Sequence, residues 1–368
     1  MNIVIVYGGK SGEHEVSLVS AASVARNIPE AGNTVSLIGI AKNGAWYLQD
    51  SALLTKIREN TTLPLSIQGD EVHRVNIVPG GGSAGALVCS GTPIPADVVF
   101  PVLHGTYGED GTIQGLFEMA EIPYVGGGVM SSSLAMDKEK TKIIWQALDL
   151  PIVPFVALTT RQWITDEKKV AACNSVEQKF PWPVFVKPAC AGSSVGAAKA
   201  NTREELITRI NEAFIWDKKV LIEPFISARE IECSVTGNGK ATTYIPGEIV
   251  PNREFYDYQA KYQDPDGAAL TVPANLSPEQ TKKVTSLAAK AYEALDLDGM
   301  ARVDFFIDKK NGELYLNEIN TIPGFTPISM FSRMCEAGGL NYQDLVMALL
   351  DLARERFTSS RTLQTDRP

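Results

Sequence analysis

The sequence is poor in the residues on which several classes of protein depend. It has only five cysteines among 368 residues. Their number is odd and none has a CxxC spacing, which predicts reduced thiols of the kind found in the cytoplasm, at Cys89, Cys173, Cys190, Cys233 and Cys335. Only three histidines are present and none is paired at a metal-ligand spacing, so a zinc enzyme is not expected. No apolar run approaches the roughly 18 residues that a membrane span requires.

Positive charge is also scarce. The chain has 34 lysines and arginines against 43 aspartates and glutamates, a formal net charge of -9 at pH 7. This balance argues against nucleic acid or an anionic membrane as the main partner, so a polyanionic ligand must be held by a few placed cations. The first seven residues have no basic n-region and no small-residue cleavage site. They are predicted to form a strand of a cytoplasmic protein and not a signal peptide.

With 368 residues the chain exceeds the size of one hydrophobic core, so two or three domains are expected. Its 44% of hydrophobic and 21% of charged residues are typical of a globular protein. Alternating patterns in the first part predict a parallel α/β domain, with strands at 2–7, 34–40, 97–103 and 122–125 and helices at 16–27 and 112–121. A long amphipathic helix is expected over 131–148. We expect three units, an N-terminal Rossmann-like α/β domain at 1–126, a small central α+β domain at 127–223 and a C-terminal α+β domain at 224–368.

A β-hairpin is predicted near the C-terminus. Residues 301–308 and 313–320 are both apolar and β-prone, and Asn311-Gly312 between them is the strongest short hairpin signal. A register centred on this turn places residue 304 opposite or diagonal to residue 318.

Polar side chains on this hairpin predict a divalent-metal site. Successive side chains alternate between the faces of a strand, so Arg302 shares a face with Asp304, and Glu318 shares a face with Asn320. Two carboxylates and an amide oxygen are hard ligands that suit Mg²⁺ and its phosphates. The alternative is an ordinary solvated strand face, although acidic residues and asparagine are depleted in strands.

Three other motifs lie at strand ends. Lys187 precedes a small-residue turn at 192–196, where backbone N–H groups and an ammonium can meet phosphate oxygens, although such turns are commonplace. The turn at 8–17 follows the first strand; its Glu13 and Glu15 are equally well explained as surface acids at a helix start. His104 begins a glycine-rich segment after another strand, and would otherwise be a satisfied loop residue.

The irregular stretch 252–275 is long for a loop. Structureless loops beyond about 12 to 15 residues are usually functional or disordered. This one holds Phe255, Tyr262 and Lys261 among other aromatic and basic residues, which is too aromatic for plain disorder. It is predicted to be a lid over a charged ligand, with a self-packed surface loop as the alternative.

Taken together, these motifs resemble the D-alanine–D-alanine ligase family of the ATP-grasp superfamily. The likeness runs from about residue 3 to about residue 345, almost the whole chain. It is carried by GGxSxExEVS at 8–17, HGxxGEDGxxQG at 104–115, MDK at 136–138, VKP…GSSVG at 186–196, and RVDFF…LNEINTIPGFTPIS at 302–329. The resemblance implies an ATP-grasp fold, in which the domains at 127–223 and 224–368 are the two ATP-grasp subdomains and the domain at 1–126 binds substrate.

The resemblance also implies an activity. ATP would phosphorylate the carboxylate of one D-alanine in the cytoplasm, and the amine of a second would attack that acyl phosphate to give D-alanyl-D-alanine for peptidoglycan. It implies that two Mg²⁺ or Mn²⁺ ions are bound by Asp304, Glu318 and Asn320. The partners would be ATP, D-alanine and a second copy of the chain in a homodimer, with neither nucleic acid nor a membrane.

Further roles follow from the resemblance, residue by residue. The nucleotide-binding positions would be Lys138, Lys187, Ser193, Ser194, Glu223, Pro224, Phe225, Ile226, Glu230, Phe255, Lys261, Asn317 and Glu318. The substrate-binding positions would be Glu15 for the ammonium of the first D-alanine, Lys261 and Ser329 for the carboxylate of the second, and His104. The catalytic positions would be Arg302 with the Gly324 backbone N–H as oxyanion stabilisers, together with Ser329 and a closing chain of Tyr262, Ser193 and Glu15.

Two other classes stay open. One is a related ligase that joins D-alanine to D-lactate or D-serine. Residue 262 and its loop bear on this alternative, because lactate-using relatives lack the tyrosine that this chain has there. The other is a non-catalytic nucleotide-binding protein on the same fold.

Overall fold

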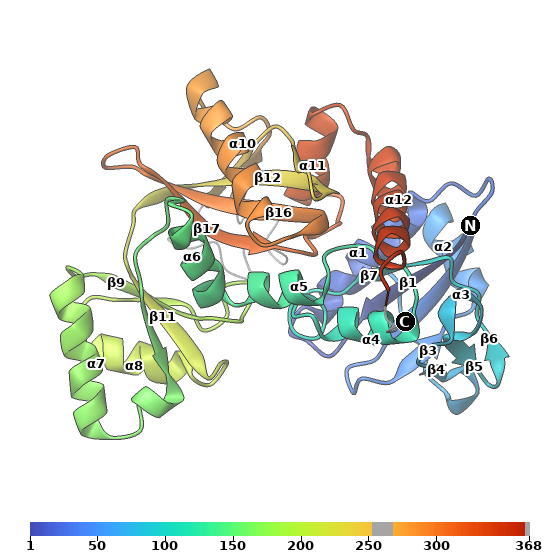
Figure 1. The fold of residues 1–368 in the computed structure, drawn as a ribbon, viewed down its shortest axis with the longest axis horizontal. Coiled ribbons are helices and arrows are strands. Elements are labelled where there is room, and N and C mark those ends of the chain that lie inside the picture. The colour runs from blue at the N-terminus through green and yellow to red at the C-terminus, as the bar shows by residue number, and fades with distance from the viewer. Residues whose placement is uncertain (252–267, 365–368) are drawn as a thin grey trace.

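The computed structural model describes residues 1–251 and 268–364. The chain forms three sheet-centred units (Figure 1): the N-terminal unit in blue, a green central unit at the opposite end of the long axis, and an orange C-terminal sheet between and above them. No helix within the described ranges is long and apolar enough to cross a membrane. The lid expected over 252–275 lies mostly outside the described residues, as do Phe255, Lys261 and Tyr262.

The N-terminal unit is built on a sheet of order β3-β2-β1-β7, in which β1 pairs in parallel with both β2 and β7. The carboxyl ends of β1 and β7 therefore lie side by side, and so do the loops that follow them. A small antiparallel sheet of order β4-β5-β6 is attached. The strands are β1 Asn2–Gly8, β2 Thr34–Ile40, β3 Trp46–Leu48, β4 Val75–Ile77, β5 Leu87–Cys89, β6 Thr92–Pro93 and β7 Val98–Val102. The helices are α1 His14–Arg26, α2 Ser51–Glu59, α3 Gly82–Gly85 and α4 Thr112–Ala120, with a 3₁₀ turn Glu71–His73.

The central unit is an antiparallel sheet of order β10-β9-β11-β8 with two helices on one face. Alternation along β9 explains its two faces, because Val184 and Val186 are buried against the helices while Phe185 and Lys187 line a cleft on the other side. Its elements are β8 Val156–Thr159, a 3₁₀ turn Thr160–Gln162, α7 Asp166–Lys179, β9 Val184–Pro188, β10 Ala198–Ala200, α8 Arg203–Ala213 and β11 Lys219–Pro224.

The C-terminal sheet has the order β15-β14-β12-β16-β17, with β13 paired to β12. Its strands are β12 Ala228–Asn238, β13 Thr242–Thr243, β14 Gly247–Pro251, β15 Ala268–Thr271, β16 Asp298–Asp308 and β17 Leu314–Asn320. The accompanying helices are α5 Val129–Met136, α6 Lys138–Ala147, α10 Pro278–Glu293, α11 Met330–Ala337 and α12 Tyr342–Ser360. The predicted hairpin is confirmed as β16–β17, with Asp304 paired to Glu318 and Arg302 to Asn320.

Two predicted elements differ from the structure. Residues 122–125 do not form a strand in the described chain but make an isolated parallel bridge between Val99 and Tyr124. The single helix expected over 131–148 is two helices, α5 and α6, because Asp137 leaves the helical conformation at ψ 96°. Its carboxylate then caps α6 by accepting the backbone N–H groups of Glu139 and Lys140 at 3.1 and 3.2 Å.

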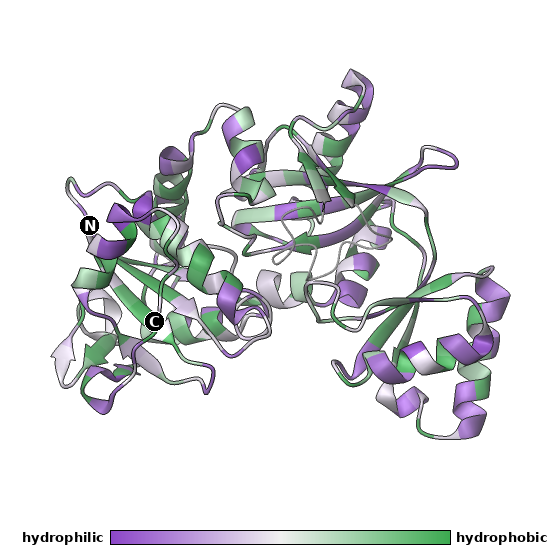
Figure 2. Ribbon diagram, turned by 180° about the vertical axis from the view of Figure 1, so that it is seen from behind, coloured by the Kyte–Doolittle hydropathy of each residue, from purple (hydrophilic) through white to green (hydrophobic). Residues whose placement is uncertain are grey.

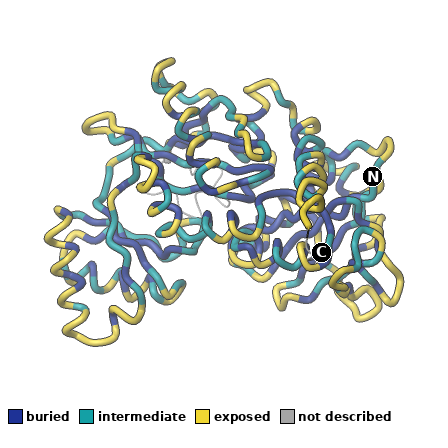
Figure 3. The backbone as a smooth tube through the Cα atoms, in the orientation of Figure 1, coloured by how far each residue is buried: buried dark blue, intermediate teal, exposed yellow. Residues whose placement is uncertain are grey.

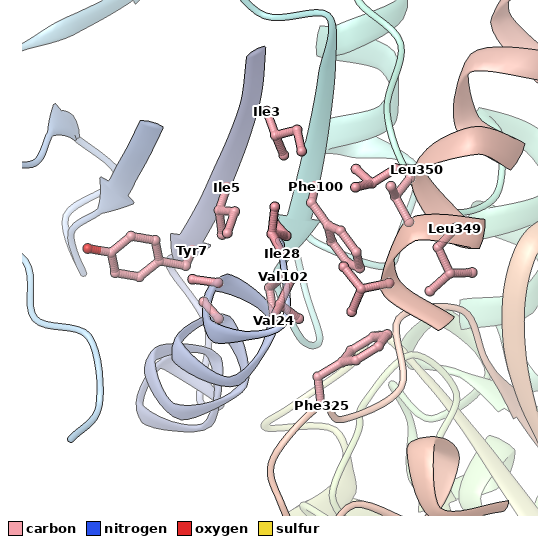
Figure 4. Packing of buried hydrophobic residues seen from close by; sticks show 14 of the residues in the cluster. Ile3, Ile5, Tyr7, Val24, Ile28, Phe100, Val102, Phe325, Leu349 and Leu350 are labelled. Atoms are coloured by element: carbon pink, nitrogen blue, oxygen red, sulfur yellow. The ribbon is translucent and has the colours of Figure 1, made fainter. Parts of the chain in front are cut away.

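The hydrophobic cores cross the expected boundaries between the three units, whose division stays a prediction. Figure 4 shows Leu349 and Leu350 of α12 packed with Phe325 against Phe100 of the N-terminal sheet. Trp145 of α6 belongs to the core of the C-terminal sheet instead of that of the central unit. The apolar strands and the mainly polar outer helices of the central unit are visible in Figure 2, and Figure 3 shows the buried sheets. The C-terminal sheet is thus fastened to the N-terminal unit, whose loops reach its polar face.

Candidate active site

A cleft of about 760 Å³ lies between the central and C-terminal sheets. Its walls come from the end of β9, the turn that follows, the connection from β11 to β12 and the β16–β17 hairpin. The residues expected to bind nucleotide or metal that line it are Lys138, Lys187, Ser193, Ser194, Glu223, Pro224, Phe225, Ile226, Glu230, Asp304, Asn317 and Glu318. The fold therefore brings together positions that the sequence spreads over 181 residue numbers, from 138 to 318.

A smaller cavity of about 90 Å³ adjoins this cleft. Ser193 and Glu318 line both spaces, so they lie where the two meet. The expected residues that line the smaller cavity are Ser193, His104, Arg302, Glu318, Asn320, Gly324 and Ser329. Glu13 and Glu109, which were not assigned a role from the sequence, line it as well.

The hairpin presents its polar side chains to both spaces as an ionic network. The Arg302 guanidinium donates to both carboxylate oxygens of Asp304, at 2.8 and 2.7 Å, and pairs with Glu232 at 3.0 Å. Asn320 donates to Asp304 at 3.0 Å. Burial lowers the pKa of Arg302, but Asp304 and Glu232 outweigh it, so the net pKa is raised. The arginine is consequently a fixed positive charge beside the smaller cavity.

The donor set fits a magnesium ion. Asp304 and Glu318 are register partners and Asn320 lies on the same face, so two carboxylates and an amide converge. Within the described ranges no group of three or more His, Cys, Asp or Glu side chains is arranged to hold a metal. A metal at the hairpin would therefore use the Asn320 amide as its third protein ligand.

Two lysines and a tight turn line the larger cleft with groups that can donate hydrogen bonds to an anion. Lys138 donates to the carbonyl oxygen of Ala191 at 2.9 Å and pairs with Glu318 at 3.2 Å. Lys187 pairs with Glu223 at 2.9 Å and donates to the Asn317 side chain at 3.1 Å. Ser193 is left-handed at φ 50°, as is the residue after it. Such turns aim consecutive backbone N–H groups at one point, an arrangement that binds anions.

Glu15 lines neither cavity, so the structure does not support its expected place with Ser193 in the chain closed by Tyr262. The Glu15 side chain is 64% exposed and pairs with Lys42 at 2.8 Å. The Ser193 hydroxyl donates instead to Glu13. Glu13 is the N-cap residue of α1, whereas Glu15 lies in its first turn. Two residues of helix rotate a side chain by about 200°, which carries Glu15 away to the solvent.

Glycines from two distant loops make room for the Glu13 carboxylate. A Cβ added at Gly105 would lie 2.8 Å from its Oε2, and one added at Gly192 would lie 3.0 Å from the same atom. Gly105 comes from the loop after β7 and Gly192 from the turn after β9. The close approach therefore places an anionic group where the N-terminal and central units meet.

His104 and Glu109 fasten the loop after β17 to the N-terminal unit. His104 Nδ1 lies 2.9 Å from the carbonyl oxygen of Ile322, and its Nε2 lies 3.1 Å from the Ser20 hydroxyl. The Ile322 N–H donates to Glu109 at 3.0 Å, and the Gly105 N–H donates to the other Glu109 oxygen at 2.8 Å. Burial lowers the pKa of His104. Glu109 stands in the HGxxGEDG motif, which was the available signal for it.

The same loop carries Gly324 and Ser329. The Ser329 hydroxyl accepts the Thr326 N–H at 2.9 Å and bonds with the Thr326 hydroxyl at 2.8 Å. A Cβ at Gly324 would lie 2.8 Å from the Ser329 hydroxyl oxygen, so a larger residue would displace that hydroxyl.

Glu109 is expected to make stability depend on pH. Burial, reinforced by the Glu13 carboxylate, raises the pKa of Glu109 from 4.5 to about 7. Between these values the folded protein keeps a proton that the unfolded chain has released, so this contribution to stability is full below pH 4.5 and is lost as the pH rises to about 7. Glu109→Gln stays neutral, so its free energy of unfolding should rise relative to the wild type across this window. Urea unfolding of both proteins at several pH values measures the difference between their free energies of unfolding. A difference that does not change with pH would contradict the raised pKa of Glu109.

Both ends of the chain match models of one protein family. Residues 2–127 match the family model described as D-ala D-ala ligase N-terminus, and residues 144–351 match the one described as D-ala D-ala ligase C-terminus. The D-alanine--D-alanine ligase of Treponema denticola is 55% identical over 367 residues, covering 100% of both chains. That of Treponema pallidum is 50% identical over 366 residues, covering 100% of this chain and 91% of its own.

Solved structures agree with the sequence relatives. The D-alanine-D-alanine ligase from Coxiella burnetii superposes with a TM-score of 0.83 at 34% identity, covering 98% of this chain and 96% of its own. The VanG D-Ala:D-Ser ligase from Enterococcus faecalis superposes with a TM-score of 0.82 at 34% identity, covering 96% of this chain and 99% of its own.

Proposed function

Because the chain belongs to the family of D-alanine–D-alanine ligases, we propose that its two adjoining cavities hold ATP and two D-alanines side by side. It is an ATP-dependent ligase of the ATP-grasp fold that joins two D-alanines to D-alanyl-D-alanine for peptidoglycan synthesis. The observation that carries the assignment of residues is that Ser193 and Glu318 line both cavities. A phosphate at this junction would reach a carboxylate in the smaller cavity.

The larger cleft is assigned to ATP. The Glu223–Ile226 connection would bind the adenine and Glu230 the ribose. Lys138, Lys187 and the left-handed turn at 193–196 would receive the phosphates, since ammonium groups and convergent N–H groups supply charge where phosphate oxygens arrive. Asp304, Glu318 and Asn320 would hold Mg²⁺ or Mn²⁺, and the metal would neutralise the negative charge of the phosphates.

The smaller cavity is assigned to D-alanine. Glu13, in place of Glu15, would accept the ammonium of the first D-alanine, because it is the carboxylate bonded to Ser193 at the junction. Arg302 and the N–H of Gly324 would stabilise the oxyanion that forms when the second amine attacks the activated carboxyl, the electrostatic role that usually dominates such reactions. Ser329 would bind the carboxylate of the second D-alanine.

His104 and Glu109 act on this chemistry through Ile322. They hold both backbone polar groups of that residue, two positions before Gly324, so the oxyanion loop is positioned from the N-terminal unit. A cytoplasmic location, a pair of metal ions, a homodimer and roles for Phe255, Lys261 and Tyr262 complete the proposal, and they rest on the family resemblance.

A second candidate is ligation of D-alanine to D-serine, which the similarity to the VanG enzyme favours. Phosphate release from ATP with Mg²⁺ is to be measured with D-alanine alone and with D-alanine plus L-alanine, D-serine or D-lactate. We expect full release with D-alanine alone and D-alanyl-D-alanine as the product. Release that requires D-serine would replace the first proposal by the second. The absence of release with every substrate would favour a non-catalytic protein.

A further inference from the structure

A lysine outside both cavities is buried beside the nucleotide cleft. Lys142 lies on α6 with a side-chain exposure of 0%. Its ammonium lies 2.9 Å from Glu223 Oε1, as an ion pair without a well-directed hydrogen bond, and 3.4 Å from the carbonyl oxygen of Val153. It is absent from the described residues that line the two cavities. Lys142 is thus placed to act on a bound nucleotide only through Glu223.

Glu223 lies between two ammonium groups. Its Oε2 is 2.9 Å from Lys187 and its Oε1 is 2.9 Å from Lys142, and its own side chain is 3% exposed. Lys187 lines the cleft, whereas Lys142 approaches from behind it. One buried carboxylate is therefore shared by two cations, of which only the one in the cleft can turn toward a ligand.

Because Lys142 and Lys187 both pair with Glu223, a movement of Lys187 toward a ligand changes the charge balance around this carboxylate. When Lys187 turns to a phosphate it leaves Glu223, and a buried carboxylate without a counter-ion is strongly destabilising. Lys142 remains at 2.9 Å and keeps the carboxylate paired. We propose that Lys142 is a positioning residue that neutralises Glu223 and thereby frees Lys187 to bind the phosphates of the nucleotide.

The charge states agree with this arrangement. Burial raises the pKa of Glu223, but Lys142 and Lys187 outweigh it, so the net pKa is lowered and the carboxylate stays ionised. Burial lowers the pKa of Lys142 to about 8, so its ammonium is predominantly charged at neutral pH. The proposal rests on the function assigned above, in which Lys187 contacts phosphate.

The test compares a nucleotide that has phosphates with a nucleoside that has none. Lys142→Met has a similar length and leaves Glu223 paired with Lys187, so the protein is expected to fold. Calorimetry with Mg²⁺ should show ADP binding weakened by about tenfold or more and adenosine binding changed by less than about threefold, because only the phosphate contact is impaired. Lys142→Gln provides the same comparison if the methionine variant does not fold.

Two further variants separate the inference from the function on which it rests. Glu223→Gln added to Lys142→Met removes the charge that holds Lys187, so it should restore the ratio of adenosine to ADP dissociation constants. Lys187→Met should weaken the binding of ADP more than the binding of adenosine. An unchanged ADP affinity in this variant would contradict the contact between Lys187 and phosphate. The role of Lys142 is overturned if Lys187→Met behaves as expected but Lys142→Met weakens the binding of ADP and adenosine equally. It is also overturned if the double variant does not restore the ratio of the two dissociation constants.

Discussion

Glu318→Gln is expected to abolish ligase activity and to leave the free energy of unfolding almost unchanged. Glu318 is the register partner of Asp304 and lines both cavities. Glutamine preserves its shape but removes one of the two carboxylate charges that would neutralise a divalent cation at the hairpin. The side chain is 24% exposed, and its partner Lys138 keeps the bond to the Ala191 carbonyl, so little packing is lost.

The measurement is ADP release with ATP and D-alanine, together with denaturant unfolding. The matched control is Glu313→Gln, the same change at an exposed position of the same hairpin, where the carboxylate bonds with Tyr315. It should leave the rate unchanged. Retention of more than about a tenth of the rate by Glu318→Gln, equivalent to a barrier increase of less than about 1.4 kcal/mol, would remove Glu318 from the metal site.

Glu13→Gln is expected to lower kcat/KM for D-alanine by at least about 30-fold, or about 2 kcal/mol, the lower range for the loss of one partner of a buried charge pair. Its carboxylate bonds with Ser193 at the junction of the two cavities, and Gly105 and Gly192 approach it closely. Removal of the charge leaves the ammonium of the first substrate without its counter-ion.

The chain supplies its own control two residues away. Glu15→Gln should change kcat/KM by less than about twofold, because exposed ion pairs such as Glu15 with Lys42 contribute little. D-alanine titrations at saturating ATP compare the two variants. Equal losses, or a larger loss in Glu15→Gln, would reverse the assignment of the substrate ammonium to Glu13.

Local patterns in the sequence were sufficient to predict the β16–β17 hairpin and the N-terminal strands β1 and β2. Apolar, β-prone segments on either side of Asn311-Gly312 predict the hairpin, and they place Asp304 opposite or diagonal to Glu318. The exact pairing of these two residues depends on a register shift between Asp304 and Phe305, which the residue order did not predict. The two strands of the hairpin are adjacent in the sequence, and successive side chains along each strand point to opposite faces of the sheet. The motif order then identified the family and, through it, most of the residues that line the nucleotide cleft.

Long-range packing determined what these patterns left open. Glu13 and Glu15 have the same chemistry and stand in the same motif, and only the approach of loops near residues 105 and 192 decides which of them faces the site. Likewise, Asp137 divides one helical pattern into two helices, α5 and α6. Both helices contribute side chains to the core of the C-terminal sheet and not to that of the central unit.

The sequence by itself therefore determined the fold class, the family and the presence of the β16–β17 hairpin, because these depend on residue order and on contacts between near neighbours. The tertiary structure alone decided that Glu13 bonds with Ser193, that Glu109 holds the backbone of Ile322, and that Lys142 shares Glu223 with Lys187. Each of these contacts joins groups from segments that are far apart in the sequence. Their geometry depends on how whole sheets and helices pack, which no local pattern encodes.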